Sequence, residues 1–118
     1  MSFREGLERI AEKVDDLLGV AIVDSEGILV QEVKADPSFD LISLVAEYSA
    51  FVKAADKASV SMELGPSYEI MVTTDKMAIM IKKINDGYFL LLAAESDQYI
   101  GKGRFFMKRE AAAFVEDL

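Results

Sequence analysis

The sequence predicts an α/β (α+β) fold in the order α-β-β-α-β-β-β-α, with residues 1–118 forming a single domain. Apolar residues recur at helical spacing near both ends and in the middle of the chain. Five short β-rich runs are bounded by turn residues. Three of these runs are apolar at both alternating positions, which is typical of strands covered on both faces. We therefore expect a five-stranded antiparallel sheet with helices on both sides.

The first helix is expected over residues 3–18. Ser2 and Glu5 have the spacing of a capping box, and apolar residues follow at intervals of three and four. Gly19 is the expected end of this helix.

Residues 20–23 and 28–33 are expected to form a hairpin, because both are β-rich and a short loop containing Gly27 separates them. The first run is apolar throughout and should be a central strand. The second turns polar at Gln31 and Glu32, which favours an edge position.

Asp36 and Pro37 predict the start of a second helix, with Asp as the cap and Pro at the first helical position. Residues 38–57 contain no Gly or Pro, so this helix should be long. A looser stretch is expected over residues 58–66.

Three further strands are expected at residues 68–74, 77–84 and 88–94, followed by a closing helix over residues 103–118. The Asn-Asp-Gly sequence at 85–87 is the strongest hairpin signal in the chain. Residues 77–81 and 88–94 are apolar at both alternating positions, so the last two strands should be central. The strand expected at residues 68–74 alternates more weakly, so it should form the other edge.

The second helix carries more apolar surface than one sheet face can cover. At about 100° per residue its main apolar residues fill an arc of roughly 120°. They are Leu41, Leu44, Val45, Tyr48, Phe51, Val52 and Ala55. A second apolar flank holds Phe39, Ile42 and Ala46, and the hydrophilic face with Asp40, Ser43 and Glu47 is narrow. The surplus favours a second subunit as partner. The alternative is coverage by other parts of the same chain.

Composition excludes several classes of function. With 13 basic and 21 acidic residues the net charge is −8, which disfavours nucleic acid and anionic membranes as partners. The absence of Cys and His removes the usual nucleophile, general base and zinc ligands, so we expect no catalytic residues, no metal and no cofactor. No signal-peptide pattern or bilayer-length apolar run is found, and a cytoplasmic location is expected.

Four local motifs could indicate a functional site, but we favour a structural explanation for each. The Gly-Lys-Gly sequence at 101–103 lacks the spacing of a phosphate-binding loop, so it is read as a flexible entry to the last helix. The acidic pairs at 15–16 and 116–117 diverge on a helix and are read as solvated faces. Six Met residues are mainly core filling, although an adaptable binding surface remains open. The main basic clusters would suit an acidic partner, or simply occupy strand and helix ends. They are Lys82 and Lys83, together with Arg104, Lys108 and Arg109.

The chain resembles the Roadblock / dynein light chain family, including its MglB-type members. Residues 19–28 (GVAIVDSEGI) are similar to that family's first hairpin, and residues 84–93 (INDGYFLLLA) to its last. Residues 101–104 resemble the glycine-led start of its final helix. A mild departure is Gln-Tyr-Ile at 98–100, where the family commonly has Asn-Leu.

The resemblance implies a profilin-like sandwich, with two helices on one sheet face and the long second helix on the other. It also implies dimerisation through that helix and the strand after it, which adds Tyr68, Ile70 and Val72 to the expected interface and creates a ten-stranded sheet. Family members are scaffolds, motor subunits or regulators of Ras-like small GTPases. We therefore expect a homodimeric, non-catalytic regulator of such a GTPase. The alternatives are a scaffold without a GTPase partner, a PAS-like or profilin-like ligand sensor and, as the weakest, an enzyme.

Overall fold

The computed structural model describes residues 3–118, so the expected Ser2 capping box lies outside the described residues. Three helices and five strands follow in the predicted order. They are α1 (Phe3–Lys13), β1 (Leu17–Asp24), β2 (Leu29–Lys34), α2 (Leu41–Ser61), β3 (Glu69–Thr73), β4 (Ala78–Asn85), β5 (Tyr88–Ala94) and α3 (Ile100–Phe114).

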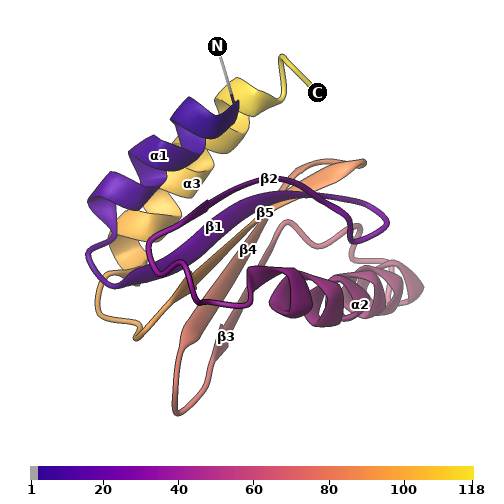
Figure 1. Cartoon of the computed structure of the whole chain (residues 1–118). Helices are drawn as coiled ribbons and strands as arrows, with labels where there is room; N and C mark the ends of the chain where they lie inside the picture. The colour runs from indigo at the N-terminus through magenta and orange to yellow at the C-terminus, as the bar shows by residue number, and fades with distance from the viewer. Residues whose placement is uncertain (1–2) are drawn as a thin grey trace.

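The five strands form one antiparallel sheet in the order β2-β1-β5-β4-β3. This confirms the prediction of three central strands between two edges, β2 and β3. Figure 1 shows α1 and α3 side by side on one face of the sheet and α2 alone on the other. The implied sandwich is therefore confirmed as well.

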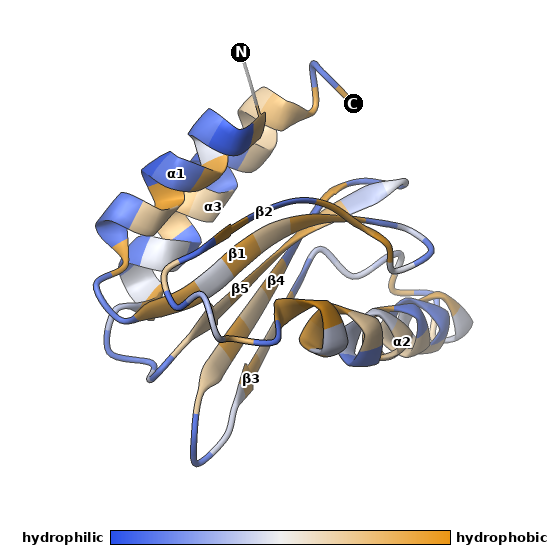
Figure 2. Cartoon of the chain, in the orientation of Figure 1, coloured by the Kyte–Doolittle hydropathy of each residue, from blue (hydrophilic) through white to orange (hydrophobic). Residues whose placement is uncertain are grey.

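Alternation along the strands divides the interior into two cores. Val20, Ile22 and Leu92 face α1 and α3, whereas Ala21 and Leu91 face α2. The central strands are consequently mostly apolar (Figure 2), although β4 turns polar at Lys82 and Lys83. Each core is closed by the apolar stripe of its helices, because burial of those side chains is the main stabilising contribution.

The predicted extension of the first helix to residue 18 is wrong. The helix ends at Lys13, and Leu17 already belongs to β1. Asp16 lies in the intervening turn, where its Oδ2 accepts hydrogen bonds from the Ser96 backbone N–H (3.0 Å) and hydroxyl (2.6 Å). Asp16 therefore anchors this turn to the segment after β5 and is not part of a solvated helix face. Gly19, the expected helix end, lies inside β1.

The predicted start of the second helix is also wrong, by one helical turn. Asp40 is the cap, and its carboxylate accepts a hydrogen bond from the Ser43 N–H at 3.1 Å. The Ser43 side chain and, after it, this backbone bond lower the pKa of Asp40. Asp36 instead accepts from the N–H and the hydroxyl of Ser38 and forms a turn that contains Pro37. The helix continues to Ser61, so the first part of the expected loop is helical.

Helix α3 begins at Ile100 and contains the Gly-Lys-Gly sequence that was expected to precede it. A Cβ on Gly103 would lie 3.4 Å from both Leu92 Cδ1 and Val14 Cγ2. Gly103 therefore lets the first turn of α3 approach the sheet closely. The helix ends at Phe114, so the acidic residues 116–117 follow it in a turn.

Candidate partner-binding surface

Helix α2 covers its sheet face with a narrow stripe. Leu41, Val45, Ser49 and Val52 are its buried residues. Ser49 is polar but satisfied, because its hydroxyl donates to the Val45 carbonyl oxygen at 2.6 Å. Three residues predicted to lie in a dimer interface, Leu41, Val45 and Val52, thus belong to the chain's own core and are not surface residues.

The rest of the predicted arc forms a partly exposed flank on the side of α2 that faces the β3–β4 hairpin, in which Leu44 and Tyr48 are half-buried and Phe51 is exposed. Leu44 and Tyr48 line an open groove of about 410 Å³ together with Met77 and the preceding turn. Phe51 continues this flank one turn further, with its ring centroid 6.2 Å from that of Tyr48, and keeps 48% of its surface exposed. We call Leu44, Tyr48 and Phe51 the hairpin-side flank.

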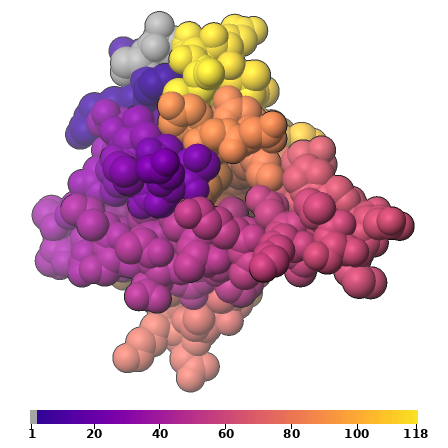
Figure 3. All heavy atoms as spheres, turned by 90° about the vertical axis from the view of Figure 1, so that its right-hand side faces the viewer, coloured from indigo at the N-terminus to yellow at the C-terminus, as the bar shows by residue number. Residues whose placement is uncertain are grey.

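In Figure 3, α2 runs as a band across the molecule, and the β3–β4 hairpin projects beyond it. The end of α2 and the segment after it protrude at one side of this view. That segment exposes Met62, Leu64 and Tyr68, with Tyr68 65% exposed. Ile70 and Val72 of β3 are half-buried beneath the hairpin-side flank and pack on the α2 core. Apolar surface therefore continues from α2 onto the β3 side of the sheet.

The outer edge of β3 presents free backbone groups. The Lys83 N–H donates to the Tyr68 oxygen at 2.9 Å, and the Thr74 N–H donates to the Met77 oxygen at 2.8 Å. Even-numbered residues of this segment therefore point their backbone groups toward β4. The odd-numbered residues Glu69, Met71 and Thr73 point theirs outward, where residues 3–118 supply no strand to receive them.

The other sheet edge is protected. The Arg4 guanidinium donates to the Glu32 carbonyl oxygen at 3.3 Å, which occupies an outward acceptor of β2. A register shift beside Val23 and the charged Glu32 and Lys34 further disfavour strand addition there. The two edges are therefore unequal, and β3 is the less blocked of the two.

The sequence analysis placed the candidate surface on α2 and β3 but did not single out Met71. Its predicted strand residues, Tyr68, Ile70 and Val72, carry side chains on the α2 face, whereas the outward backbone groups belong to the alternate residues. Only the register with β4 reveals this, because side-chain type does not report the direction of a backbone N–H.

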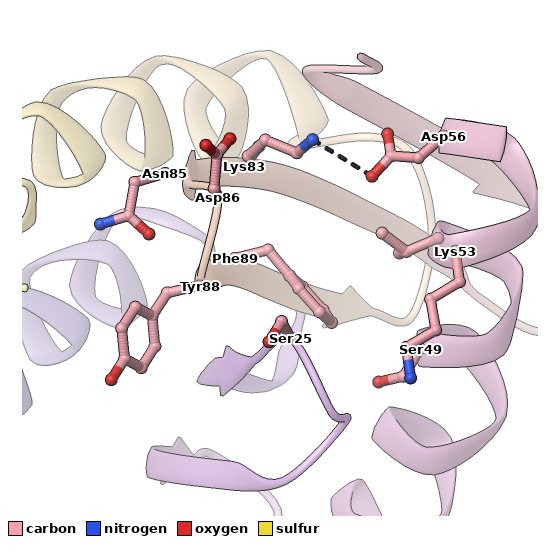
Figure 4. Close-up of a pocket in the computed structure, with 10 residues that line it drawn as sticks. Ser25, Ser49, Lys53, Asp56, Lys83, Asn85, Asp86, Tyr88 and Phe89 are labelled. Carbon is pink, nitrogen blue, oxygen red and sulfur yellow. Dashed lines mark hydrogen bonds and ion pairs between the residues drawn. The ribbon is translucent and has the colours of Figure 1, made fainter. Parts of the chain in front are cut away.

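A partly enclosed pocket lies at the other end of α2, between the β1–β2 and β4–β5 turns (Figure 4). One wall is the ion pair between Lys83 Nζ and Asp56 Oδ2, at 3.1 Å. Its volume of about 110 Å³ lies well below the roughly 300–1,000 Å³ of small-molecule sites. The β1–β2 turn packs tightly here, since a Cβ on Gly27 would lie 2.9 Å from Ser49 Cβ. The pocket thus gives no support to the ligand-sensor alternative.

Within residues 3–118, no group of three acidic side chains is placed to hold a metal ion, and no helix has the length and apolar character needed to cross a membrane.

A five-stranded antiparallel sheet between a two-helix layer and one long helix defines the α/β sandwich class that includes Roadblock domains. The family model of the Roadblock/LC7 domain matches residues 7–94, from the middle of α1 to the end of β5. The chain belongs to the Roadblock/LC7 family. No match was found among curated protein sequences.

Solved structures give the same fold. Myxococcus xanthus MglB matches with a TM-score of 0.84 and 14% identity, over 99% of this chain and 97% of its own. An MglB with a tetrameric arrangement matches with a TM-score of 0.85 and 16% identity, over 96% and 85%. MglC from Myxococcus xanthus is 28% identical over the whole of both chains, with a TM-score of 0.71. The chain is thus similar to MglC in sequence and superposes more closely on MglB.

Proposed function

We propose that this chain is a non-catalytic, cytoplasmic protein-binding module that forms a homodimer and regulates or scaffolds a Ras-like small GTPase. The observation that carries the dimer is the open edge of β3 directly beside the hairpin-side flank of α2. Pairing of two β3 strands would satisfy the outward groups of Glu69, Met71 and Thr73 and create a ten-stranded sheet. Contact between the two α2 helices would cover Tyr48 and Phe51 in the same step.

The GTPase part of the proposal rests on membership in the Roadblock/LC7 family and on the likeness to MglB. A dimer built through β3 and one side of α2 leaves the remaining α2 surface, including Ile42 and Glu47, available for a partner. Such a module acts by shaping the loops of the bound GTPase, since it brings no His or Cys of its own.

The substitution Met71→Pro tests whether two chains pair through β3. Proline removes the Met71 N–H, which points away from β4, so the internal ladder keeps its hydrogen bonds. Each subunit of the dimer loses one outward donor and gains a steric block. We expect light scattering to give twice the chain mass for the wild type and the chain mass for Met71→Pro.

Met71→Ala is the matched control, because it shortens the same side chain and keeps the N–H. We expect it to remain dimeric. A Met71→Pro protein that is folded by circular dichroism and still dimeric contradicts pairing through β3.

The partner is tested with a Ras-like GTPase encoded beside this chain, loaded in turn with GDP and with a non-hydrolysable GTP analogue. We expect the dimer to bind one nucleotide state more tightly than the other in a calorimetric titration. A dimer that binds neither form contradicts the GTPase role and favours the homodimeric scaffold.

A further inference from the structure

A groove of about 260 Å³ lies between α3 and β4, on the opposite sheet face from α2. Its apolar part is formed by Ile84, Ala111, Ala112 and Val115, and Val115 keeps 47% of its surface exposed. Lys82, Lys83 and Lys108 also line the groove, and no acidic residue does. The groove therefore combines an apolar floor with a basic rim.

The charge around this groove is opposite to that of the chain. Lys82 lies opposite Glu69 in the β3–β4 ladder, and Arg104 holds Glu69 in a two-pronged ion pair with both N···O distances at 2.7 Å. Lys82 and Lys108 also lie near enough to Glu69 to lower its pKa, after the larger effect of the Arg104 hydrogen bonds. One carboxylate thus faces three cations, in a chain whose net charge is −8.

Lys82 and Lys108 form no direct ion pair within residues 3–118. Glu69 is already bound by Arg104. The ammonium of Lys83 is directed to Asp56, on the other face of the sheet. Two lysines on the rim are therefore available to a ligand, because neither must break an internal ion pair to bind one.

We propose that this groove binds a short acidic peptide segment that carries one large apolar side chain. Lys82 and Lys108 would pair with carboxylates on either side of that residue, and its apolar side chain would lie over Ile84 and against Val115. The volume is smaller than that of a typical small-molecule site and suits one or two side chains. The ligand is thus a segment of a partner protein that contributes few residues.

Charge complementarity selects a peptide over larger polyanions. A nucleic acid or an anionic bilayer would extend beyond the groove and face the rest of a chain whose net charge is −8. A segment of about five residues contacts only the basic region and avoids that repulsion. The groove is lined by β4 and the C-terminal part of the chain and contains no residue of α2 or β3, so the inference does not depend on the proposed dimer.

The test is a titration of the isotope-labelled full chain with the peptide acetyl-Glu-Glu-Leu-Glu-Glu-amide, followed by backbone amide chemical shifts. We expect saturable shifts confined to β4 and the second half of α3, centred on Lys82, Ile84 and Val115. The same peptide with Lys in place of Glu should give none. Binding should weaken severalfold when the salt concentration is raised to about 0.5 M, because the pairs lie at the surface.

Two double variants separate the groove from a general charge effect. Lys82→Glu with Lys108→Glu should weaken binding at least tenfold. Lys53→Glu with Lys57→Glu makes the same charge change on exposed residues of α2 and should leave binding unchanged. Glu69→Gln removes the one competing carboxylate, so we expect tighter binding.

Shifts spread over the whole surface, an equal loss in both double variants, or binding of the chain to phosphatidylserine vesicles without binding of the peptide would each overturn the proposal. Melting curves of all variants verify that the fold is kept.

Discussion

The hairpin-side flank of α2 makes a quantitative prediction through Phe51. Full burial of a Phe side chain stabilises by about 1.5–3 kcal/mol. Phe51 keeps 48% of its surface exposed in the single chain, so covering the remainder gains about 1 kcal/mol per copy. A two-fold dimer uses both copies, so Phe51→Ala should cost about 2 kcal/mol and raise the dissociation constant roughly 30-fold.

The matched control is Ile42→Ala. Ile42 is 68% exposed on the same helix, yet nine residues separate it from Phe51, which places the two on opposite sides at about 180°. If every exposed apolar side chain of α2 stabilised the dimer, Ile42→Ala would weaken it at least as much as Phe51→Ala does.

We expect the dissociation constant of Ile42→Ala to equal that of the wild type in analytical ultracentrifugation over a range of concentrations near dissociation. Equal weakening by both variants, or no effect of Phe51→Ala, would refute the assignment of the interface to this side of α2.

Two further predictions concern stability. Gly6→Ala should lower the free energy of unfolding by about 1–3 kcal/mol in urea denaturation, because the new Cβ would lie 2.6 Å from Phe114 Cε1 and 3.2 Å from Glu110 Oε1 in a filled core; unchanged stability would contradict this packing. The Arg104 hydrogen bonds lower the pKa of Glu69 below its usual value of 4.5, so their stabilising effect is present above pH 4.5 and is lost as the pH falls through the lowered pKa. The difference in unfolding free energy between the wild type and Glu69→Gln should therefore narrow as the pH falls from about 5 to 3, and a pH-independent difference would argue against the ion pair.

The order of elements and the division into central and edge strands were predictable, because they depend on hydrophobic periodicity and alternation, which can be read from a single sequence. Helix ends were not. The apolar spacing of α1 continues through Val14 and Leu17 into β1, since a buried strand also supplies apolar residues. Asp36 and Asp40 both precede helix-forming residues, and only the hydrogen bond to Ser43 identifies Asp40 as the cap.

For the candidate surface, the sequence could not separate core residues of α2 from exposed ones. Ser49 can be buried against the sheet because its hydroxyl donates a hydrogen bond to a backbone carbonyl of its own helix. The apolar pattern of the sequence does not indicate this burial, because Ser is polar. The predicted arc was therefore centred too far toward Phe51, and it merged core residues such as Val45 with the exposed flank. The basic groove was visible in the sequence only as separate clusters, because Lys82 and Lys108 meet through tertiary packing.

The difference between the two sheet edges limits how many chains can associate by strand pairing. A chain with two receptive edges would add copies one after another and form an open fibre. Here Arg4 occupies one outward carbonyl of β2, and in the proposed dimer the pairing of β3 with its own copy would use the other edge. Self-association through strands would then stop at two chains, and a larger complex would have to form through side-chain surfaces. Removal of the Arg4 side chain would therefore lower the solubility of the protein more than its free energy of unfolding.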